Sequence, residues 1–287
     1  MFNPLYPKQY YLVLLSGGFL DNQLKSLIKL KDSNLTILEK LFEIFSKYNE
    51  DKILKKIITL PENYLDYLKG IDSFNNIENY LSKYEIIKSG EKLIDTIKNV
   101  LNRILNSQQD DNQQNEIKIT EIYLLFVATD TPFVSYEAIN DIIFRLDYIE
   151  GDLFFPIVSK EVYEVKYSNK ASKLRTFVKL KNDSFCGTSL FIIKKDVINI
   201  FLNLLQNLLE NRKKPLKLAE IFGYDIIFKL IFKNLTVLEL EERINKLFNI
   251  KAHAILTNYA ELAFNIDKKQ DLEFYNQFLI NSNLLKT

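Results

Sequence analysis

Two apolar runs in the sequence end in residue types that could bind a phosphate-bearing ligand. The run YYLVLL at 10–15 leads into a serine and the pair Gly17 and Gly18. Because glycine lacks a Cβ atom, phosphate oxygens can approach such a loop, whose successive N–H groups form an anion site. The run EIYLLFVATDTP at 121–132 carries Asp130 near its end, and Mg²⁺ prefers carboxylate oxygen together with phosphate.

Each of these features also has a purely structural interpretation. A Gly-Gly turn after a strand is common. Asp130 is followed by Thr131 and Pro132, so its side chain could simply cap the helix that comes next. At the level of the single motif, both interpretations stay open.

The remaining reactive residue types narrow the chemistry. Cys186 is the only cysteine and His253 the only histidine, which excludes an intramolecular disulfide and a Cys/His zinc site. We expect Cys186 to be a small buried residue and His253 to be structural, because neither has a visible partner. Any reaction must therefore use carboxylates, amides, hydroxyls and cations.

The composition sets wide bounds on the protein class. With 287 residues, 47% of them hydrophobic, the chain can form one large domain or two small ones. Lys and Arg number 38 against 37 Asp and Glu, a net charge of +1, so no overall field attracts nucleic acid or an anionic membrane. The apolar run at 10–15 is far shorter than the ~20 residues of a membrane span. We expect a cytoplasmic protein with no nucleic-acid or membrane partner.

Hydrophobic patterns predict alternating strands and helices. Thr36, followed three residues later by Glu39, predicts a capped helix start. The polar stretch at 106–115 predicts a surface loop. The predicted strands are 10–15, 55–60, 84–90, 121–132, 152–160, 175–182 and 253–257, and the predicted helices are 36–48, 91–105, 135–145, 194–248 with breaks near Pro215 and Gly223, and 271–279.

This alternation predicts an α/β fold with a mainly parallel sheet. In such sheets, ligands lie beyond the carboxyl ends of the strands, near a switch in strand order. We therefore expect the end of the strand at 10–15 and Asp130 to lie at one edge of the sheet.

The order of four motifs resembles one known family. The motifs are LLSGG at 14–18, KSLIKL at 25–30, VATDTP at 127–132 and FNIDKKQDL at 264–272. Over about residues 10–280 the chain is similar to the MobA-like nucleotidyltransferases. The resemblance implies a three-layer α/β sandwich with a mainly parallel twisted sheet, a Rossmann-like nucleotidyltransferase fold, and a helical insertion before the last strand.

The resemblance also implies a role for each matching residue. Lys25 stands at the family's lysine position and would neutralise pyrophosphate, and Asp130 would hold Mg²⁺. In the late motif Asn265 would be the second metal ligand, with Asp267 as the alternative. The nucleotide would contact Ser16, Gly17, Gly18, Lys25, Ser89 and Gly90, and the acceptor would contact Lys160, Arg175, Lys179 and Gly187.

The implied activity is Mg²⁺-dependent transfer of a nucleoside monophosphate from a nucleoside triphosphate to a small phosphate-bearing acceptor, with release of pyrophosphate. A single domain at 8–287 would divide into a nucleotide-binding half, about 8–150, and an acceptor half, about 151–287. The helical insertion at about 194–250 would cover the acceptor half or pair two subunits into a homodimer.

Some positions depart from the family pattern. The segment FLDNQL at 19–24 has neither the arginine nor the third glycine of the family loop, and Asn265 brings no charge to a metal. These departures favour one alternative, a nucleotide- or metabolite-binding protein with weakened catalysis. A second alternative is a nucleotide-sugar glycosyltransferase. Such an enzyme would be expected to have an acidic D-x-D motif, but Pro132 occupies the position of its second aspartate, which argues against this alternative.

Overall fold

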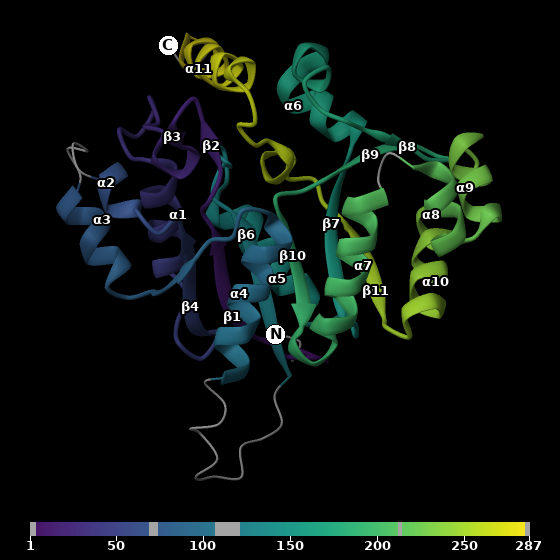
Figure 1. The fold of residues 1–287 in the computed structure, drawn as a ribbon. Helices are drawn as coiled ribbons and strands as arrows, with labels where there is room; N and C mark the ends of the chain where they lie inside the picture. Colours follow the sequence, from purple (N-terminus) through teal and green to yellow (C-terminus); the bar gives the residue numbers. More distant parts are fainter. Residues whose placement is uncertain (1–3, 69–73, 107–120, 212–213, 285–287) are drawn as a thin grey trace.

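A nine-stranded sheet with helices on both faces forms the centre of the protein in the computed structural model (Figure 1). The structure describes residues 4–68, 74–106, 121–211 and 214–284. A separate two-stranded hairpin, β2 (Phe19–Leu20) and β3 (Gln23–Leu24), follows the first strand. The sheet strands are β1 (Gln9–Leu15), β4 (Ile53–Leu60), β5 (Glu85–Lys88), β6 (Ile122–Ala128), β7 (Leu153–Ser159), β8 (Val178–Lys179), β9 (Ser184–Gly187), β10 (Leu190–Lys194) and β11 (Ala252–Leu256).

The strand order confirms the predicted, mainly parallel sheet. The order is β5-β4-β1-β6-β10-β7-β9-β8, and β11 also pairs with β7. Strands β5, β4, β1 and β6 are parallel neighbours, β11 is parallel to β7, and β10 runs antiparallel between β6 and β7. From β1 the chain first builds outward through β4 and β5 and then returns to place β6 on the other side of β1. The ends of β1 and β6 are thus a switch point of the kind where ligands bind.

Helices complete the three predicted layers. One hydrophobic cluster joins one face of the sheet to α1, α3 and α5, and a second joins the other face to α4 and α7. Helices α6 and α11 lie beyond the carboxyl ends of the strands, at the top of Figure 1. The helices are α1 (Ile37–Ser46), α2 (Tyr64–Leu68), α3 (Phe74–Leu81), α4 (Leu93–Asn106), α5 (Tyr136–Leu146), α6 (Lys160–Ser172), α7 (Ile198–Asn211), α8 (Pro215–Phe222), α9 (Tyr224–Ile231), α10 (Val237–Phe248) and α11 (Lys269–Leu284).

Local sequence explains where the central helices begin. At α1, Thr36 accepts a hydrogen bond from the Glu39 backbone and Glu39 accepts one from the Thr36 backbone, which is the predicted capping box. At α5, the Ser135 hydroxyl accepts a hydrogen bond from the Ala138 backbone. Helix α5 therefore starts soon after Asp130 and fixes the direction of the turn that carries it.

Helices α7 to α10 form the predicted insertion before the last strand, β11. The last of them also protects the edge of the sheet. From α10, the Glu241 carboxylate accepts a hydrogen bond from the Ala254 N–H, and the Asn245 side chain accepts one from the Ala252 N–H. These contacts satisfy backbone donors that an edge strand would otherwise expose.

Two sequence predictions in the second half need correction. The predicted strand at 152–160 ends at Ser159, whose hydroxyl caps α6, so Lys160 is helical. The predicted strand at 175–182 shrinks to β8, two exposed residues that pair only with β9. The antiparallel strand β10 and helix α6 were not predicted. The predicted loop at 106–115 lies outside the described residues from 107 onward.

Within the described ranges, every helix is too short or too polar to cross a lipid bilayer.

Candidate active site

The loop after β1 is held by buried hydroxyl groups. The Ser16 and Ser26 hydroxyls are 2.6 Å apart, and the Ser16 N–H donates to the Thr59 carbonyl at 3.1 Å. Both serines are buried. Ser16 therefore anchors the loop, while the residues after it are free to face a ligand.

The glycines at the site have different reasons to be glycine. A Cβ atom at Gly90 would lie 2.4 Å from Asp95 Cβ and 2.8 Å from the Thr96 backbone nitrogen, so the chain's own packing requires glycine there. A Cβ atom at Gly17 would lie 3.0 Å from Ser89 Cβ, which shows how closely the two loops approach.

Gly18 is under no such constraint. Its nearest neighbour would be Lys25 Cδ at 3.5 Å, an ordinary van der Waals contact. The fold therefore has space for a side chain at this position. Glycine at 18 leaves the backbone open on the side that Lys25 faces.

A β-hairpin brings Lys25 back to the glycine loop. Asp21 and Asn22, at the turn between β2 and β3, have φ angles of 47° and 64°, as in the type I′ turns of tight hairpins. The Lys25 N–H then donates to the Gly18 carbonyl at 2.9 Å. The segment at 19–24, which lacks the family's arginine, is thus an ordered turn. Aspartate followed by asparagine, both tolerant of positive φ, was the signal for it.

The end of β6 lies beside the end of β1. Ala128 is the register partner of Leu15, and the Thr129 hydroxyl donates to the Leu15 carbonyl at 3.0 Å. The Thr131 hydroxyl donates to the Ala128 carbonyl at 3.1 Å and tightens the turn. Asp130 sits between these two threonines, so its backbone is fixed on both sides.

The late motif joins the same region through backbone hydrogen bonds. The Ile266 N–H donates to the Asp130 carbonyl at 2.8 Å. At the start of α11, the buried Asp271 carboxylate accepts hydrogen bonds from the N–H groups of Asp267 and Lys268, each at 2.8 Å. Asp271 was not among the predicted site residues, although an acidic side chain in the first turn of a predicted helix was a signal for such a cap.

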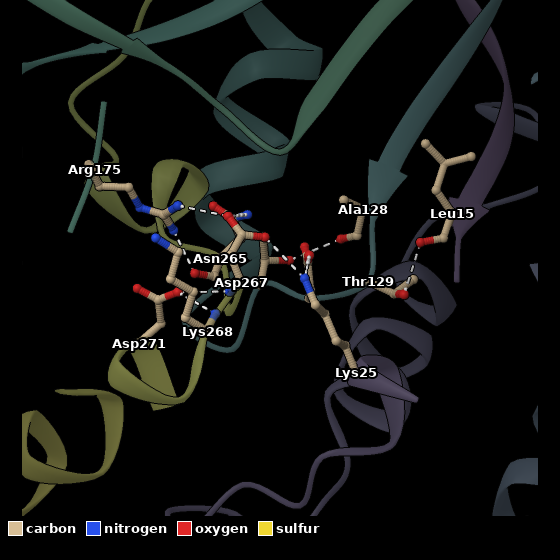
Figure 2. Close-up of polar contacts among 11 residues, drawn as sticks. Leu15, Lys25, Ala128, Thr129, Arg175, Asn265, Asp267, Lys268 and Asp271 are labelled. Atoms are coloured by element: carbon tan, nitrogen blue, oxygen red, sulfur yellow. Dashed lines mark hydrogen bonds and ion pairs between the residues drawn. The ribbon is translucent and has the colours of Figure 1, made fainter. Parts of the chain in front are cut away.

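Figure 2 shows Asp267 between two cations, with Lys25 on one side and Arg175 on the other. Lys25 Nζ lies 3.0 Å from Asp267 Oδ1 and 3.4 Å from Asp130 Oδ2. Arg175 lies 3.6 Å from Asp267 Oδ2. The Asn265 amide nitrogen donates to Asp267 Oδ2 at 2.8 Å. Five residues from four parts of the chain thus form one polar and charged cluster.

Asp130 is the most buried carboxylate of this cluster. Burial raises its pKa above the ordinary value, and the Lys25 ammonium group opposes that change. Its Oδ1 atom is buried and has no hydrogen-bond partner among the described residues. A buried carboxylate oxygen without a donor is a position where a cation could bind.

The donor set fits a small hard cation. Asp130 and Asp267 supply carboxylate oxygens. The described parts of the chain contain no group of three or more His, Cys, Asp or Glu side chains suited to a metal, so a metal here would have two carboxylate ligands from the protein. Mg²⁺ is commonly bound by one or two carboxylates while phosphate and water complete its shell. A pair of carboxylates beside an anion loop therefore suffices.

Arg175 holds the late loop from the other side. Its guanidinium group donates to the Asn265 carbonyl at 2.7 Å and lies over the Phe264 ring, 5.3 Å from the ring centre. Only 10% of its side chain is exposed. The structure thus places Arg175, a predicted acceptor contact, against the predicted metal ligands.

The other predicted acceptor residues have different surroundings in the described structure. Lys160 pairs with Glu164 at 3.3 Å, one turn further along α6. Lys179 is exposed on β8. A Cβ atom at Gly187 would lie 2.8 Å from the end of the exposed Phe155 ring. The acceptor roles of these residues stay predictions.

Lys40 is a site residue that the sequence did not reveal. Its ammonium group, on α1, donates to the Pro132 carbonyl at 2.8 Å and so supports the turn after Asp130. Burial lowers its pKa. The two residues are 92 positions apart, and no local pattern signals such a contact.

Cys186 and His253 agree with their structural interpretation. Cys186 is buried, and burial raises the pKa of its thiol to about 11, which disfavours the reactive thiolate. The His253 ring stacks on Phe154 at the amino end of β11, away from the charged cluster.

Comparison with solved structures identifies the fold. A hypothetical transferase from Thermus thermophilus matches with a TM-score of 0.67 and 21% identity, over 93% of this chain and 100% of that one. A 4-diphosphocytidyl-2C-methyl-D-erythritol synthase from Anaerococcus prevotii matches with a TM-score of 0.50 and 12% identity, over 95% of this chain and 96% of that one. This chain has the fold of these enzymes.

A second 4-diphosphocytidyl-2C-methyl-D-erythritol synthase matches with a TM-score of 0.50 and 11% identity, over 94% of this chain and 98% of that one. Neither a family model nor a curated protein matches the sequence. The fold predicted from the motifs is therefore confirmed, whereas membership of the MobA-like family is not tested by these matches.

Proposed function

We propose that this protein is a nucleotidyltransferase of the MobA-like type. It transfers a nucleoside monophosphate from a nucleoside triphosphate to a small phosphate-bearing acceptor. An acceptor oxygen attacks the α-phosphorus, the bond from that phosphorus to the bridging oxygen of the β-phosphate breaks, and pyrophosphate leaves. An acceptor phosphate is already anionic at neutral pH, so the reaction needs no general base.

The observation that carries this proposal is the meeting of Lys25 with Asp130 and Asp267 beside Gly18. It brings an open backbone loop, a cation and two carboxylates to the switch point of a parallel sheet. Catalysis of phosphoryl and nucleotidyl transfer rests mainly on such positioning and on charge stabilisation. The fold shared with a 4-diphosphocytidyl-2C-methyl-D-erythritol synthase is consistent with this chemistry.

Each part of the cluster has a task in this reaction. The backbone at Gly17 and Gly18 admits the phosphates, and Lys25 neutralises charge on the leaving pyrophosphate. Arg175 and Asn265 orient Asp267. Ser89, beside Gly17, contacts the nucleoside end of the substrate.

Asp130 and Asp267 would hold Mg²⁺. When bound, the ion supplies Lewis-acid stabilisation of the charge that develops on the α-phosphate. We assign the second metal ligand to Asp267 rather than to Asn265, because the Asn265 amide nitrogen donates to Asp267 and, of these two residues, Asp267 is the one that contacts Lys25. Asn265 then acts by fixing the orientation of that carboxylate.

The first experiment is a thermal-shift screen with ATP, CTP, GTP and UTP, each with and without Mg²⁺. It compares the wild type with Asp130→Asn and with Asp51→Asn, a matched control at an exposed position before β4. We expect one triphosphate with Mg²⁺ to raise the Tm of the wild type and of the control by about 5 °C or more, at a large excess over its Kd. Asp130→Asn should lose the shift.

Turnover then separates an enzyme from a binding protein. Pyrophosphate release with a panel of small phosphorylated acceptors supports the proposal. Binding without release supports a weakened binding protein, and release of a nucleoside diphosphate from a nucleotide sugar supports a glycosyltransferase. If the triphosphate raises the Tm of Asp130→Asn as much as that of the wild type, Asp130 is not part of the site.

We also propose, separately, that the helical insertion pairs two subunits into a homodimer. Sedimentation equilibrium measures the oligomeric state.

A further inference from the structure

We infer that Lys25 also acts as an internal counter-ion that excludes divalent metal from the free protein until a triphosphate draws its ammonium group away. This inference rests on the proposed function, since it concerns how that site is loaded. Lys25 would then also contribute to specificity. A ligand with too little negative charge would not draw the ammonium group away from Asp130 and Asp267, so the two carboxylates would stay unavailable to the metal.

The geometry places the ammonium group where a bound cation would compete with it. Lys25 Nζ lies 3.0 Å from Asp267 Oδ1 and 3.4 Å from Asp130 Oδ2, so it contacts both carboxylates at once. Only 13% of the Lys25 side chain and 19% of the Asp130 side chain is exposed. In such a partly buried setting, attraction between opposite charges is stronger than on an open surface.

The charges of the cluster already balance without a metal. Asp130 and Asp267 carry two negative charges, and Lys25 and Arg175 carry two positive charges. Lys25 contacts both carboxylates, and Arg175 contacts Asp267. Asp130 Oδ1 has no hydrogen-bond partner among the described residues, but a divalent cation that entered alone and bound both carboxylates would have to displace the Lys25 ammonium group. Its binding to the free protein should therefore be weak.

A triphosphate changes this balance. The Lys25 side chain runs along Gly18, with its Cδ, Cε and Nζ atoms 3.5, 3.8 and 4.0 Å from the place of a Cβ atom on that residue. Phosphates bound at the glycine loop would therefore meet the ammonium group after a short movement. Lys25 would then exchange its carboxylate partners for phosphate oxygens and free Asp130 and Asp267 for the metal. Metal and triphosphate should consequently bind with positive coupling, and the coupling must be reciprocal.

The test measures Mn²⁺ binding to the full chain by electron paramagnetic resonance, first without nucleotide. We expect Lys25→Met to bind Mn²⁺ about tenfold more tightly than the wild type, because it keeps most of the unbranched side chain and removes the competing charge. The matched control is Lys268→Met, which removes the charge of an exposed residue that follows Asp267 in the chain. That control should stay within about twofold of the wild type.

The second titration adds the α,β-methylene analogue of the triphosphate selected by the thermal-shift screen. The analogue should tighten Mn²⁺ binding in the wild type, and the gain should be about tenfold smaller in Lys25→Met. Lys25→Gln repeats both titrations in case the methionine disturbs packing.

The outcomes distinguish this inference from the proposed function. If Lys25→Met and Lys25→Gln bind free Mn²⁺ no more tightly than the wild type, while the wild type still binds Mn²⁺ with the analogue, the inference is wrong and the proposed function stands. If the wild type binds no Mn²⁺ even with the analogue, the proposed function fails and the inference fails with it.

Discussion

Lys25 and Asp267 are 242 positions apart in the chain, yet the Nζ atom of one lies 3.0 Å from the Oδ1 atom of the other. Lys25 reaches this position because the β2–β3 hairpin turns the chain back at Asp21 and Asn22. Asp267 reaches it because the late loop bonds to the Asp130 turn and to the start of α11. The contact joins a loop near the start of the chain to a loop near its end, and the candidate site lies where these loops meet.

Asp267 and Asn265 should differ in their effect on catalysis. We expect Asp267→Asn to lower kcat/KM by roughly 100-fold or more, because it removes a charge from the metal site, and Asn265→Ala to lower it by roughly tenfold, because it only loosens Asp267. Pyrophosphate release measures both. The reverse ranking would make Asn265 the metal ligand.

Arg175 offers a choice between two roles. If it positions Asp267, Arg175→Lys should lower kcat and weaken Mn²⁺ binding, since lysine cannot contact Asp267 and the Asn265 carbonyl in the same planar geometry. The KM of the acceptor should change little. A large rise in that KM with kcat preserved would instead show that Arg175 binds the acceptor phosphate.

Substitutions at Gly18 and Gly90 should have different effects, the first mainly on triphosphate binding and the second on the stability of the fold. Gly18→Ala should leave the free energy of unfolding within about 0.5 kcal/mol of the wild type, because the new Cβ atom meets only ordinary contacts in the chain. It should weaken triphosphate binding by about tenfold or more, because the same Cβ atom lies where the phosphates approach the backbone. Gly90→Ala should destabilise the fold by about 2 kcal/mol, because its Cβ atom would overlap Asp95. Urea unfolding and nucleotide titration measure the two effects. Unchanged nucleotide binding in Gly18→Ala would mean that the loop is only a turn.

Lys8 should make stability depend on alkaline pH. It is buried and donates to the carbonyls of Leu146 and Ile149 at the end of α5, and burial lowers its pKa to about 8, against a partly opposing effect of Asp147. Between about pH 8 and the ordinary lysine pKa, the unfolded chain holds a proton that the folded chain has lost. The contribution of Lys8 to stability must therefore rise with pH in this window, by up to about 1.4 kcal/mol per pH unit, and fall as pH drops toward 8.

Urea unfolding of the wild type and Lys8→Met at pH 7, 8, 9 and 9.5 checks this sign. The free energy of unfolding of the wild type, relative to the variant, should increase over this series. A constant difference would show that Lys8 keeps its ordinary pKa in the folded protein.

The sequence by itself determined the elements whose signals are local. Uninterrupted apolar runs predicted β1 and β6, because strands covered on both faces have no polar side. The pair Thr36 and Glu39 predicted the start of α1, because a capping box is complete within four residues. The same reasoning placed Asp130 at a strand end, and the alternation of elements was enough to predict a mainly parallel sheet.

Only the tertiary structure decided which of these residues meet. The antiparallel position of β10 depends on pairing with β6 and β7, which lie far away in the chain. The segment at 175–182 alternates like a strand, yet most of it has no strand to pair with. Contacts such as Lys25 with Asp267 or Lys40 with Pro132 join distant segments, and no local spacing encodes them. The candidate residues could therefore be predicted from local sequence patterns, but only packing over the whole chain brought five of them into one site.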